Sequence, residues 1–143
     1  MKETRIEIFY QEGDRNLGNP KGSSRPRFTR GGHTYMPAPY VKHKKFVADQ
    51  LPTLMIDKPI RLTVVFYFKP SKSWSKHKKE SHIGQPHIIK PDIDNLLKTI
   101  LDAGNNKLWT DDVLIYEIRT FKKWDSTART VLIIEELRND DED

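Results

Sequence analysis

The sequence predicts a single α/β (α+β) domain with a mixed β-sheet, built in the order β-α-β-α-β-β. Two observations lead to this fold class. Segments rich in alternating, β-branched or aromatic residues, which favour strands, are separated by two segments whose apolar residues recur with helical spacing. The chain also has 143 residues, of which 36% are hydrophobic, and this suits one modest core without a second domain.

The first half of the chain contains two predicted strands, a loop and a helix. Residues 4–10 alternate sufficiently to form the first strand, whereas residues 11–32 are rich in Gly, Asn, Pro, Ser and Arg and are predicted to be a flexible basic loop. Residues 39–51 have a moderately amphipathic helical pattern. Residues 60–69 are β-branched and aromatic almost throughout, which predicts a strand.

The second half is expected to contain a loop, a helix, two strands and a tail. Residues 70–90 are polar and basic and are predicted to be a second flexible loop. A helix is expected over residues 92–103, followed by strands over 113–123 and 129–137. The acidic residues 139–143 are expected to form a frayed tail.

The predicted helix over residues 92–103 begins with an unusual cluster of charge. Its buried face follows the i, i+3, i+4, i+7, i+8 pattern through Ile93, Leu96, Leu97, Ile100 and Leu101. Lys90 precedes a proline and favours an extended conformation, so Asp92 is expected at the N-cap with Asp94 in the first turn. In the cap conformation Asp92 can converge with Asp94, which two fully helical positions would not allow.

More charged residues follow the same helix. Asp94, Lys98 and Asp102 are spaced to share one polar stripe, and Asp111 and Asp112 come soon after the helix. Clustered carboxylates repel one another, and a divalent cation removes that repulsion. The segment therefore predicts a magnesium site, with Lys98 placed to reach a phosphate near the metal.

Each piece of this cluster also has an ordinary structural explanation. Asp at an N-cap and in the first turn satisfies free backbone N–H groups and the helix dipole. Asp94 and Lys98 could form a surface ion pair, and Asp111 and Asp112 could form a solvated turn before a strand. These explanations do not account for the accumulation of acids, a lysine and Asn95 at the two ends of one helix.

The motif as a whole resembles that of RusA-type Holliday junction resolvases (crossover junction endodeoxyribonucleases). The resemblance covers about residues 90–115 and combines a K-P-D-x-D-N-x-x-K block, Asp102-Ala103, and a W-x-D-D block that begins at Trp109. The order of the predicted elements on either side also agrees with that family. One departure is Ala103 to Lys107, where Gly104 is expected to end the helix slightly earlier than in many relatives.

The resemblance implies catalytic roles for four residues. Asp92, Asp94 and Asp112 would be metal ligands of the catalytic centre, and Lys98 would place a positive charge near the scissile phosphate. Mg²⁺ suits such all-oxygen ligands, and Mn²⁺ should substitute for it. The activity implied is resolution of four-way DNA junctions by paired hydrolysis of phosphodiester bonds, in DNA recombination and repair.

Charge is distributed unevenly along the chain, which has a net charge of +5. Residues 1–90 hold 18 Lys and Arg against 7 Asp and Glu, with basic clusters over residues 25–30, 42–45 and 69–79. Any one of these clusters could be a solvated surface, but together with the acidic centre they indicate contacts with DNA phosphates. The predicted DNA-binding residues are Arg25, Arg27, Arg30, Lys72, Lys76, Lys78, Lys79 and Lys90.

Several other classes of protein fit the sequence less well. The chain has no cysteine, which excludes disulfides and zinc-thiolate sites. It also has no apolar run longer than a strand, so a cytoplasmic protein without membrane contact is expected. The five histidines follow no ligand spacing and are interpreted as surface or loop residues. Trp109 is expected to anchor the core beside the catalytic turn.

A four-way junction is nearly two-fold symmetric and must be cut on two strands, so a homodimer is expected, with one Asp92, Asp94 and Asp112 centre in each chain. Two alternatives stay open. A non-catalytic DNA-binding protein would share the basic loops, and another Mg²⁺-dependent phosphotransfer enzyme could use a D-x-D motif, although such a motif normally ends a buried strand.

Overall fold

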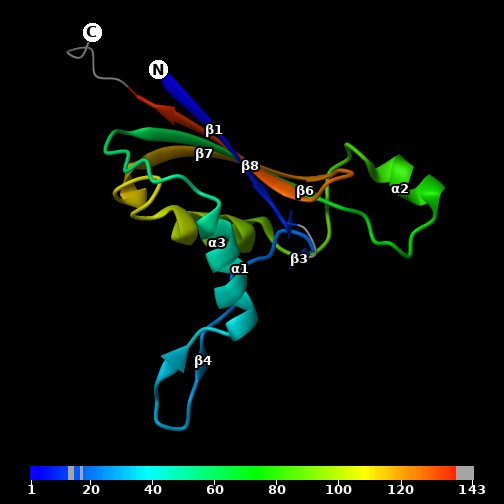
Figure 1. Ribbon diagram of the computed structural model, residues 1–143, viewed down its shortest axis with the longest axis horizontal. Coiled ribbons are helices and arrows are strands. Elements are labelled where there is room, and N and C mark those ends of the chain that lie inside the picture. Colours follow the sequence, from blue (N-terminus) through cyan, green and yellow to red (C-terminus); the bar gives the residue numbers. More distant parts are fainter. Residues whose placement is uncertain (13–14, 17, 138–143) are drawn as a thin grey trace.

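A mixed four-stranded sheet forms the body of the molecule in the computed structural model, which describes residues 1–12, 15–16 and 18–137 (Figure 1). The strand order is β1-β8-β6-β7. The four strands are β1 (Lys2–Phe9), β6 (Ile60–Phe68), β7 (Ile115–Trp124) and β8 (Arg129–Glu136). Strand β8 is antiparallel to β1 and β6, whereas β7 is parallel to β6 and leaves its other edge at the border of the sheet.

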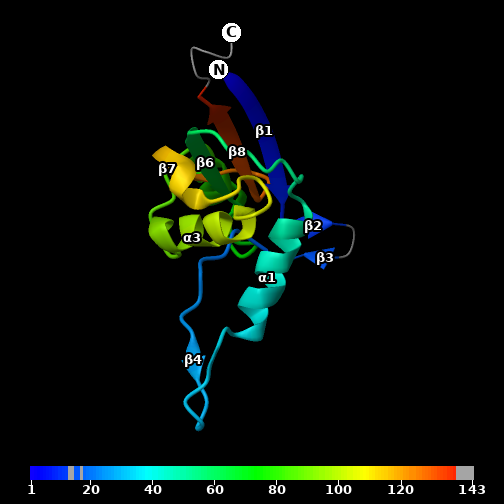
Figure 2. The same ribbon diagram turned by 90° about the vertical axis from the view of Figure 1, so that its left-hand side faces the viewer.

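Helices α1 (Ala38–Asp49) and α3 (Ile93–Gly104) lie on the same side of the sheet and contact one another (Figures 1 and 2). Helix α3 connects the parallel strands β6 and β7, and it runs in the opposite direction to both (Figure 1). The predicted α+β class and the order β-α-β-α-β-β are therefore confirmed by β1, α1, β6, α3, β7 and β8.

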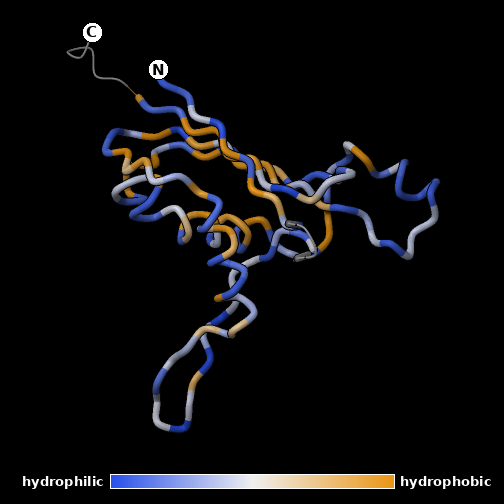
Figure 3. Tube along the Cα trace, in the orientation of Figure 1, coloured by the Kyte–Doolittle hydropathy of each residue, from blue (hydrophilic) through white to orange (hydrophobic). Residues whose placement is uncertain are grey.

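The core lies between the sheet and the two helices. Alternate residues of β6 are buried on the helical side, from Ile60 to Phe68, and Leu96 and Ile100 of α3 are 1% exposed. Apolar residues accordingly concentrate in the central strands, whereas the projecting segments are mainly hydrophilic (Figure 3). Each such side chain contributes about 1.5–3 kcal/mol to folding through burial.

The turn after α3 is fixed by a close contact between Gly104 and Trp109. A Cβ atom on Gly104 would lie 2.8 Å from Trp109 Cζ2, so only glycine fits at this position. Trp109 is fully buried, which confirms the prediction that it anchors the core. Helix α3 continues through Gly104, and Asn105 is its C-cap.

The strand predicted over residues 113–123 begins two residues later than expected. The side chain of Asp111 accepts a hydrogen bond from the backbone N–H of Val113 at 3.0 Å and caps the short 3-10 helix η1 (Asp112–Leu114). Because this local hydrogen bond stabilises a helical turn, β7 begins only at Ile115.

The two predicted loops contain regular structure that the sequence analysis missed. The first contains or borders the short strands β2 (Gln11–Glu12), β3 (Arg15–Asn16), β4 (Arg27–Phe28) and β5 (Thr34–Tyr35). The second contains α2 (Lys76–His82), whose N-cap Ser75 accepts a hydrogen bond from Lys78 N–H. The prediction of a continuous loop over 70–90 is therefore wrong, and α2 escaped notice because none of its residues is buried.

The predicted tail over residues 139–143 lies outside the described residues. Among the helices in the described ranges, none combines the length and the apolar character needed to cross a membrane.

Candidate metal and DNA site

Asp92 and Asp94 line one open cavity at the N-terminus of α3. Pro91 precedes them, and Asp92 has the extended backbone of an N-cap (φ −68°, ψ 144°), as predicted. The Asp92 carboxylate makes no capping hydrogen bond and instead accepts one from Lys90 Nζ at 3.0 Å. Its side chain keeps 52% of its surface exposed, so its oxygens can reach a ligand in the cavity.

Lysines from two segments surround this carboxylate. Lys122 and Lys123, at the end of β7, line the same cavity as Asp92 and Asp94. Desolvation lowers the pKa of the Lys122 ammonium, the Asp92 carboxylate opposes this by raising it, and Lys90 lowers it further. Lys122 also donates a hydrogen bond to the carbonyl of Ile89 at 2.6 Å. The cavity thus combines two acids with several cations, an arrangement suited to a metal ion and a phosphate.

Asp112 lies at the other end of α3 and β7. It belongs to η1, immediately before β7, whereas Asp92 interacts electrostatically with Lys122 near the end of that strand. The 12 residues of α3 alone span about 18 Å. Within the described ranges, no three His, Cys, Asp or Glu side chains are grouped closely enough to hold a metal ion. One chain therefore does not assemble the predicted centre of Asp92, Asp94 and Asp112.

Lys98 is exposed on α3, one turn after Asp94. The surface ion pair between Lys98 and Asp94 that offered an alternative explanation is not formed: no carboxylate of the described residues lies within ion-pair distance of Lys98. Asn95 uses its backbone carbonyl to accept hydrogen bonds from Ser23 N–H at 3.0 Å and from Thr99 Oγ1 at 3.4 Å. The first turn of α3 is thereby tied to the segment that precedes β4.

The predicted DNA-binding residues occupy two projections and the cavity. Arg25, Arg27 and Arg30 are exposed on and beside the β4–β5 hairpin, while Lys90 lines the cavity of the D-x-D pair. The lysines of the second projection surround α2, namely Lys72, Lys76, Lys78 and Lys79. In Figure 1 the hairpin and α2 extend from different sides of the body.

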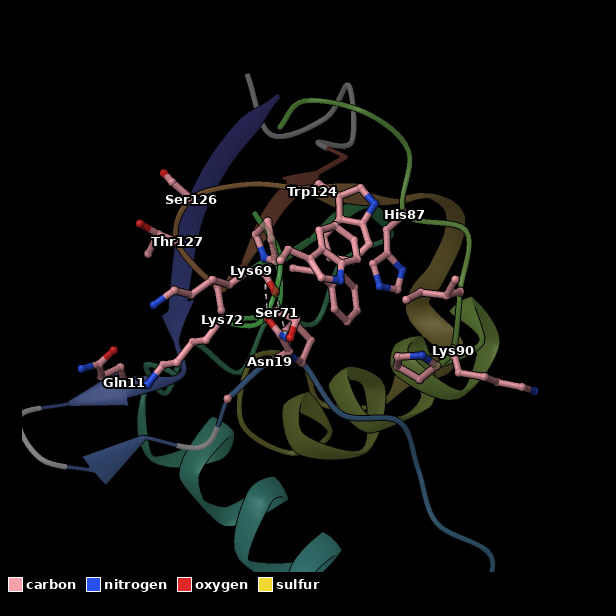
Figure 4. A pocket seen from close by; sticks show the side chains of 18 of the residues that line it. Gln11, Asn19, Lys69, Ser71, Lys72, His87, Lys90, Trp124, Ser126 and Thr127 are labelled. Carbon is pink, nitrogen blue, oxygen red and sulfur yellow. Dashed lines mark hydrogen bonds between the residues drawn. The ribbon is translucent and has the colours of Figure 1, made fainter. Parts of the chain in front are cut away.

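A second cavity of about 750 Å³ adjoins the first, and sequence reasoning did not anticipate it (Figure 4). The two cavities share His87, Ile89 and Lys90. The His87 ring stacks on Phe68 at 3.9 Å between centroids and lies 4.5 Å from Trp124. The only feature of the sequence that indicates this cavity is the concentration of tryptophan and histidine around residues 74–87 and at Trp124.

The interpretation of the histidines as surface or loop residues is wrong for His43, which is buried in α1, whereas His87 lies in a loop, as expected, but is buried there. His43 and His87 are both 4% exposed, and His43 stacks on the buried ring of Tyr10. Burial is the main reason that the pKa of each imidazole falls to about 4, and Lys21 and Lys122 lower the pKa values of His43 and His87 further. Both rings are consequently neutral near pH 7.

Comparisons with known proteins agree with the resemblance seen in the motif. Residues 18–135 match the family described as "Endodeoxyribonuclease RusA". The chain is also 29% identical over 131 residues to a Bacillus subtilis (strain 168) protein named "Uncharacterized protein YqaN", in an alignment that covers 84% of this chain and 92% of the relative. The matched range contains both blocks of the motif, α1, α3, β6, β7 and all but the last residue of β8.

Proposed function

Because the chain belongs to the RusA endodeoxyribonuclease family, we propose that it is a Mg²⁺-dependent endonuclease that resolves four-way DNA junctions in recombination and repair. The observation that carries this proposal is the pair Asp92 and Asp94 in one open cavity bordered by lysines. The basic hairpin and the basic α2 segment supply the remaining surface for a branched polyanion.

The donor set fits a hard divalent cation. Asp92 and Asp94 offer carboxylate oxygens, and the Asp92 oxygens are not engaged in helix capping. Bound Mg²⁺ would lower the pKa of a water molecule and stabilise charge that develops on the phosphate, and Mn²⁺ should substitute. Lys90 would give up its contact with Asp92 and turn to a DNA phosphate, while Lys98 would add positive charge one turn along α3.

The third predicted ligand, Asp112, would come from a second copy of the chain. β7 is an edge strand whose outer side is paired with residues 84–87 only near its end, so no other part of the described chain pairs with the stretch over 115–121. This stretch also exposes large apolar side chains, namely Tyr116, Ile118 and Phe121. An open, partly apolar edge strand is suited to pairing with another strand.

Antiparallel pairing of two β7 strands about a two-fold axis would complete the centre. A register centred at Ile118 sets Ile115 opposite the partner's Phe121, so that Asp112 would approach the Lys122 end of the partner subunit. That end carries the partner's Asp92 and the partner's Asp94. The proposed homodimer thus has two centres, each built from both chains, as paired cleavage of a symmetric junction requires.

A labelled four-way junction incubated with the protein, with and without Mg²⁺, tests the proposal. We expect two symmetric cuts with Mg²⁺ or Mn²⁺ and binding without cleavage in EDTA. Binding without cleavage under all conditions would indicate a non-catalytic DNA-binding protein. Failure to bind the junction would favour another phosphotransfer enzyme, although the D-x-D motif here begins a helix and does not end a strand.

A further inference from the structure

The β4–β5 hairpin forms a basic arm that projects from the body of the molecule (Figures 1 and 2). Its two strands are paired through Arg27 with Tyr35 and Phe28 with Thr34, and Thr29 N–H donates to the carbonyl of His33 at 2.8 Å to close the turn. Residues 21–37, which form the arm and its base, hold four Lys and Arg and no Asp or Glu. Such an arm is attracted to a polyanion and carries no acidic side chain that would repel DNA.

Phe28 is the most exposed aromatic side chain of this arm. It keeps 76% of its surface exposed, although it is a large apolar residue, and its neighbours Arg25, Arg27 and Arg30 are cationic. The body of the protein therefore gains little from Phe28 by burial. An exposed aromatic ring between arginines matches the apolar wedges with which DNA-binding proteins separate neighbouring bases.

The base of the arm is fixed to the helix that carries the D-x-D pair. Ser23 N–H donates to the carbonyl of Asn95 at 3.0 Å, and Thr99 Oγ1 donates to the carbonyl of Lys21 at 3.2 Å. A Cβ atom on Gly22 would lie only 3.0 Å from Asn95 Cβ, so glycine allows this close approach. Asn95 directly follows Asp94, which means that the arm is attached beside the proposed metal ligands.

We propose that Phe28 inserts against the base pairs at the branch point of the junction, and that the attachment at Asn95 sets the distance from the branch point to the cut. The proposal rests on the proposed junction-resolving function. In an open four-way junction, the base pairs at the branch point have no stacking neighbour on one side, so a wedge displaces little stacking there. The chain from Ser23 to Phe28 reaches at most about 18 Å, which confines the cut to phosphates near the branch point.

Fluorescence of 2-aminopurine in a synthetic four-way junction measures insertion. The base analogue is placed beside the branch point or, as a control, in the middle of one duplex of the junction. Ca²⁺ replaces Mg²⁺ as an oxygen-liganded cation. The protein should raise fluorescence several-fold when the analogue is beside the branch point and not when it is in the middle of the duplex. Phe28→Ala should lose this rise, keep junction binding within a few-fold, and cut on the order of ten times more slowly. Phe28→Trp should restore the rise.

Leu54→Ala serves as the matched control, because Leu54 is an exposed apolar residue outside the arm and should leave the fluorescence unchanged. A full rise with Phe28→Ala would overturn the wedge while the junction-resolving function stands. The wedge would likewise be overturned, and the junction-resolving function would stand, if the unaltered protein binds and cuts the junction without a rise in fluorescence. A protein that neither binds nor cuts the junction would contradict the proposed function and the wedge together.

The role of the attachment is tested by mapping the cut. Gly22→Val places methyl groups where Asn95 lies and should spread cleavage over neighbouring phosphates, while the fluorescence rise at the branch point persists. Gly31→Ala, a glycine change at the tip of the arm, should keep a single cut position. An unaltered single cut position with Gly22→Val would show that the attachment does not set the distance.

Discussion

At the scale of single residues, the D-x-D carboxylates should act in catalysis and not in DNA affinity. Asp94→Asn keeps the size of the side chain but removes a charged metal ligand, so cleavage should be abolished. Junction binding should persist or tighten, because repulsion between the carboxylate and phosphates falls. Gel-shift and cleavage assays on one labelled junction measure both quantities. Cleavage by Asp94→Asn at the unaltered rate would refute the assignment of this residue.

Lys98 should contribute to the rate without contributing to metal affinity. The side chain is exposed and forms no ion pair within the described part of the chain, so Lys98→Ala should not disturb folding. If the ammonium stabilises charge on the phosphate, the cleavage rate should fall by about 10²-fold or more. The Mg²⁺ concentration that gives half-maximal cleavage should hardly change. A rate equal to that of the unaltered protein would assign Lys98 to the solvated surface.

The two buried histidines should make stability depend on pH. Their pKa values are about 4 in the folded protein, against 6.5 for the ordinary side chain, so the unfolded chain binds more protons between these values. The free energy of unfolding should therefore decrease as pH falls from about 6.5 to about 4. His87→Phe should weaken this dependence in urea titrations, whereas His77→Ala, at an exposed position, should preserve it. Equal slopes in both variants would exclude His87 as the cause.

At the scale of elements, the sequence predicts those helices and strands in which apolar residues recur at a regular spacing. Strand β6 and helix α3 appear within a residue or two of their expected bounds, because β6 alternates in burial and the buried residues of α3 recur at helical spacing. Helix α2 and the β4–β5 hairpin have no such period. They depend on Ser75 as a cap and on a short turn at Thr29, which are weaker signals in the sequence. The burial of His87 depends on Trp124, which is distant in the sequence, and has no local signal.

The basic arm should contribute to DNA binding through counterion release. Replacing Arg25, Arg27 and Arg30 with Ala should weaken junction binding and flatten its dependence on log salt by about 0.9 for each phosphate that the arm no longer neutralises. A control variant replaces Lys2, Arg5 and Lys45, which carry the same total charge but pair with carboxylates on the body. The control variant should keep the salt dependence of junction binding that the unaltered protein shows. Equal slopes in the arm variant and the unaltered protein would place the DNA surface elsewhere.

At the scale of the whole molecule, topology decides what spacing along the chain cannot. The motif correctly places Asp92 at the cap of α3 and Asp94 in its first turn, beside one cavity. The family resemblance implies that Asp112 joins them as the third carboxylate. However, the crossover from β6 to the parallel strand β7 carries the chain along α3 and away from that cavity, so Asp112 lies at the opposite end. Only the three-dimensional arrangement therefore points to a centre shared between two chains.

Mixing two inactive variants tests this shared centre most directly. Asp94→Asn and Asp112→Asn are co-expressed with different tags, and the mixed dimer is purified and given a supercoiled cruciform plasmid with Mg²⁺. If each centre takes Asp112 from the partner, one centre of the mixed dimer holds both substitutions and the other holds none. The mixed dimer should then nick one strand and yield open circles, whereas each variant alone leaves the plasmid supercoiled and the unaltered protein yields linear plasmid. An inactive mixed dimer, beside an active unaltered protein, would contradict the shared centre.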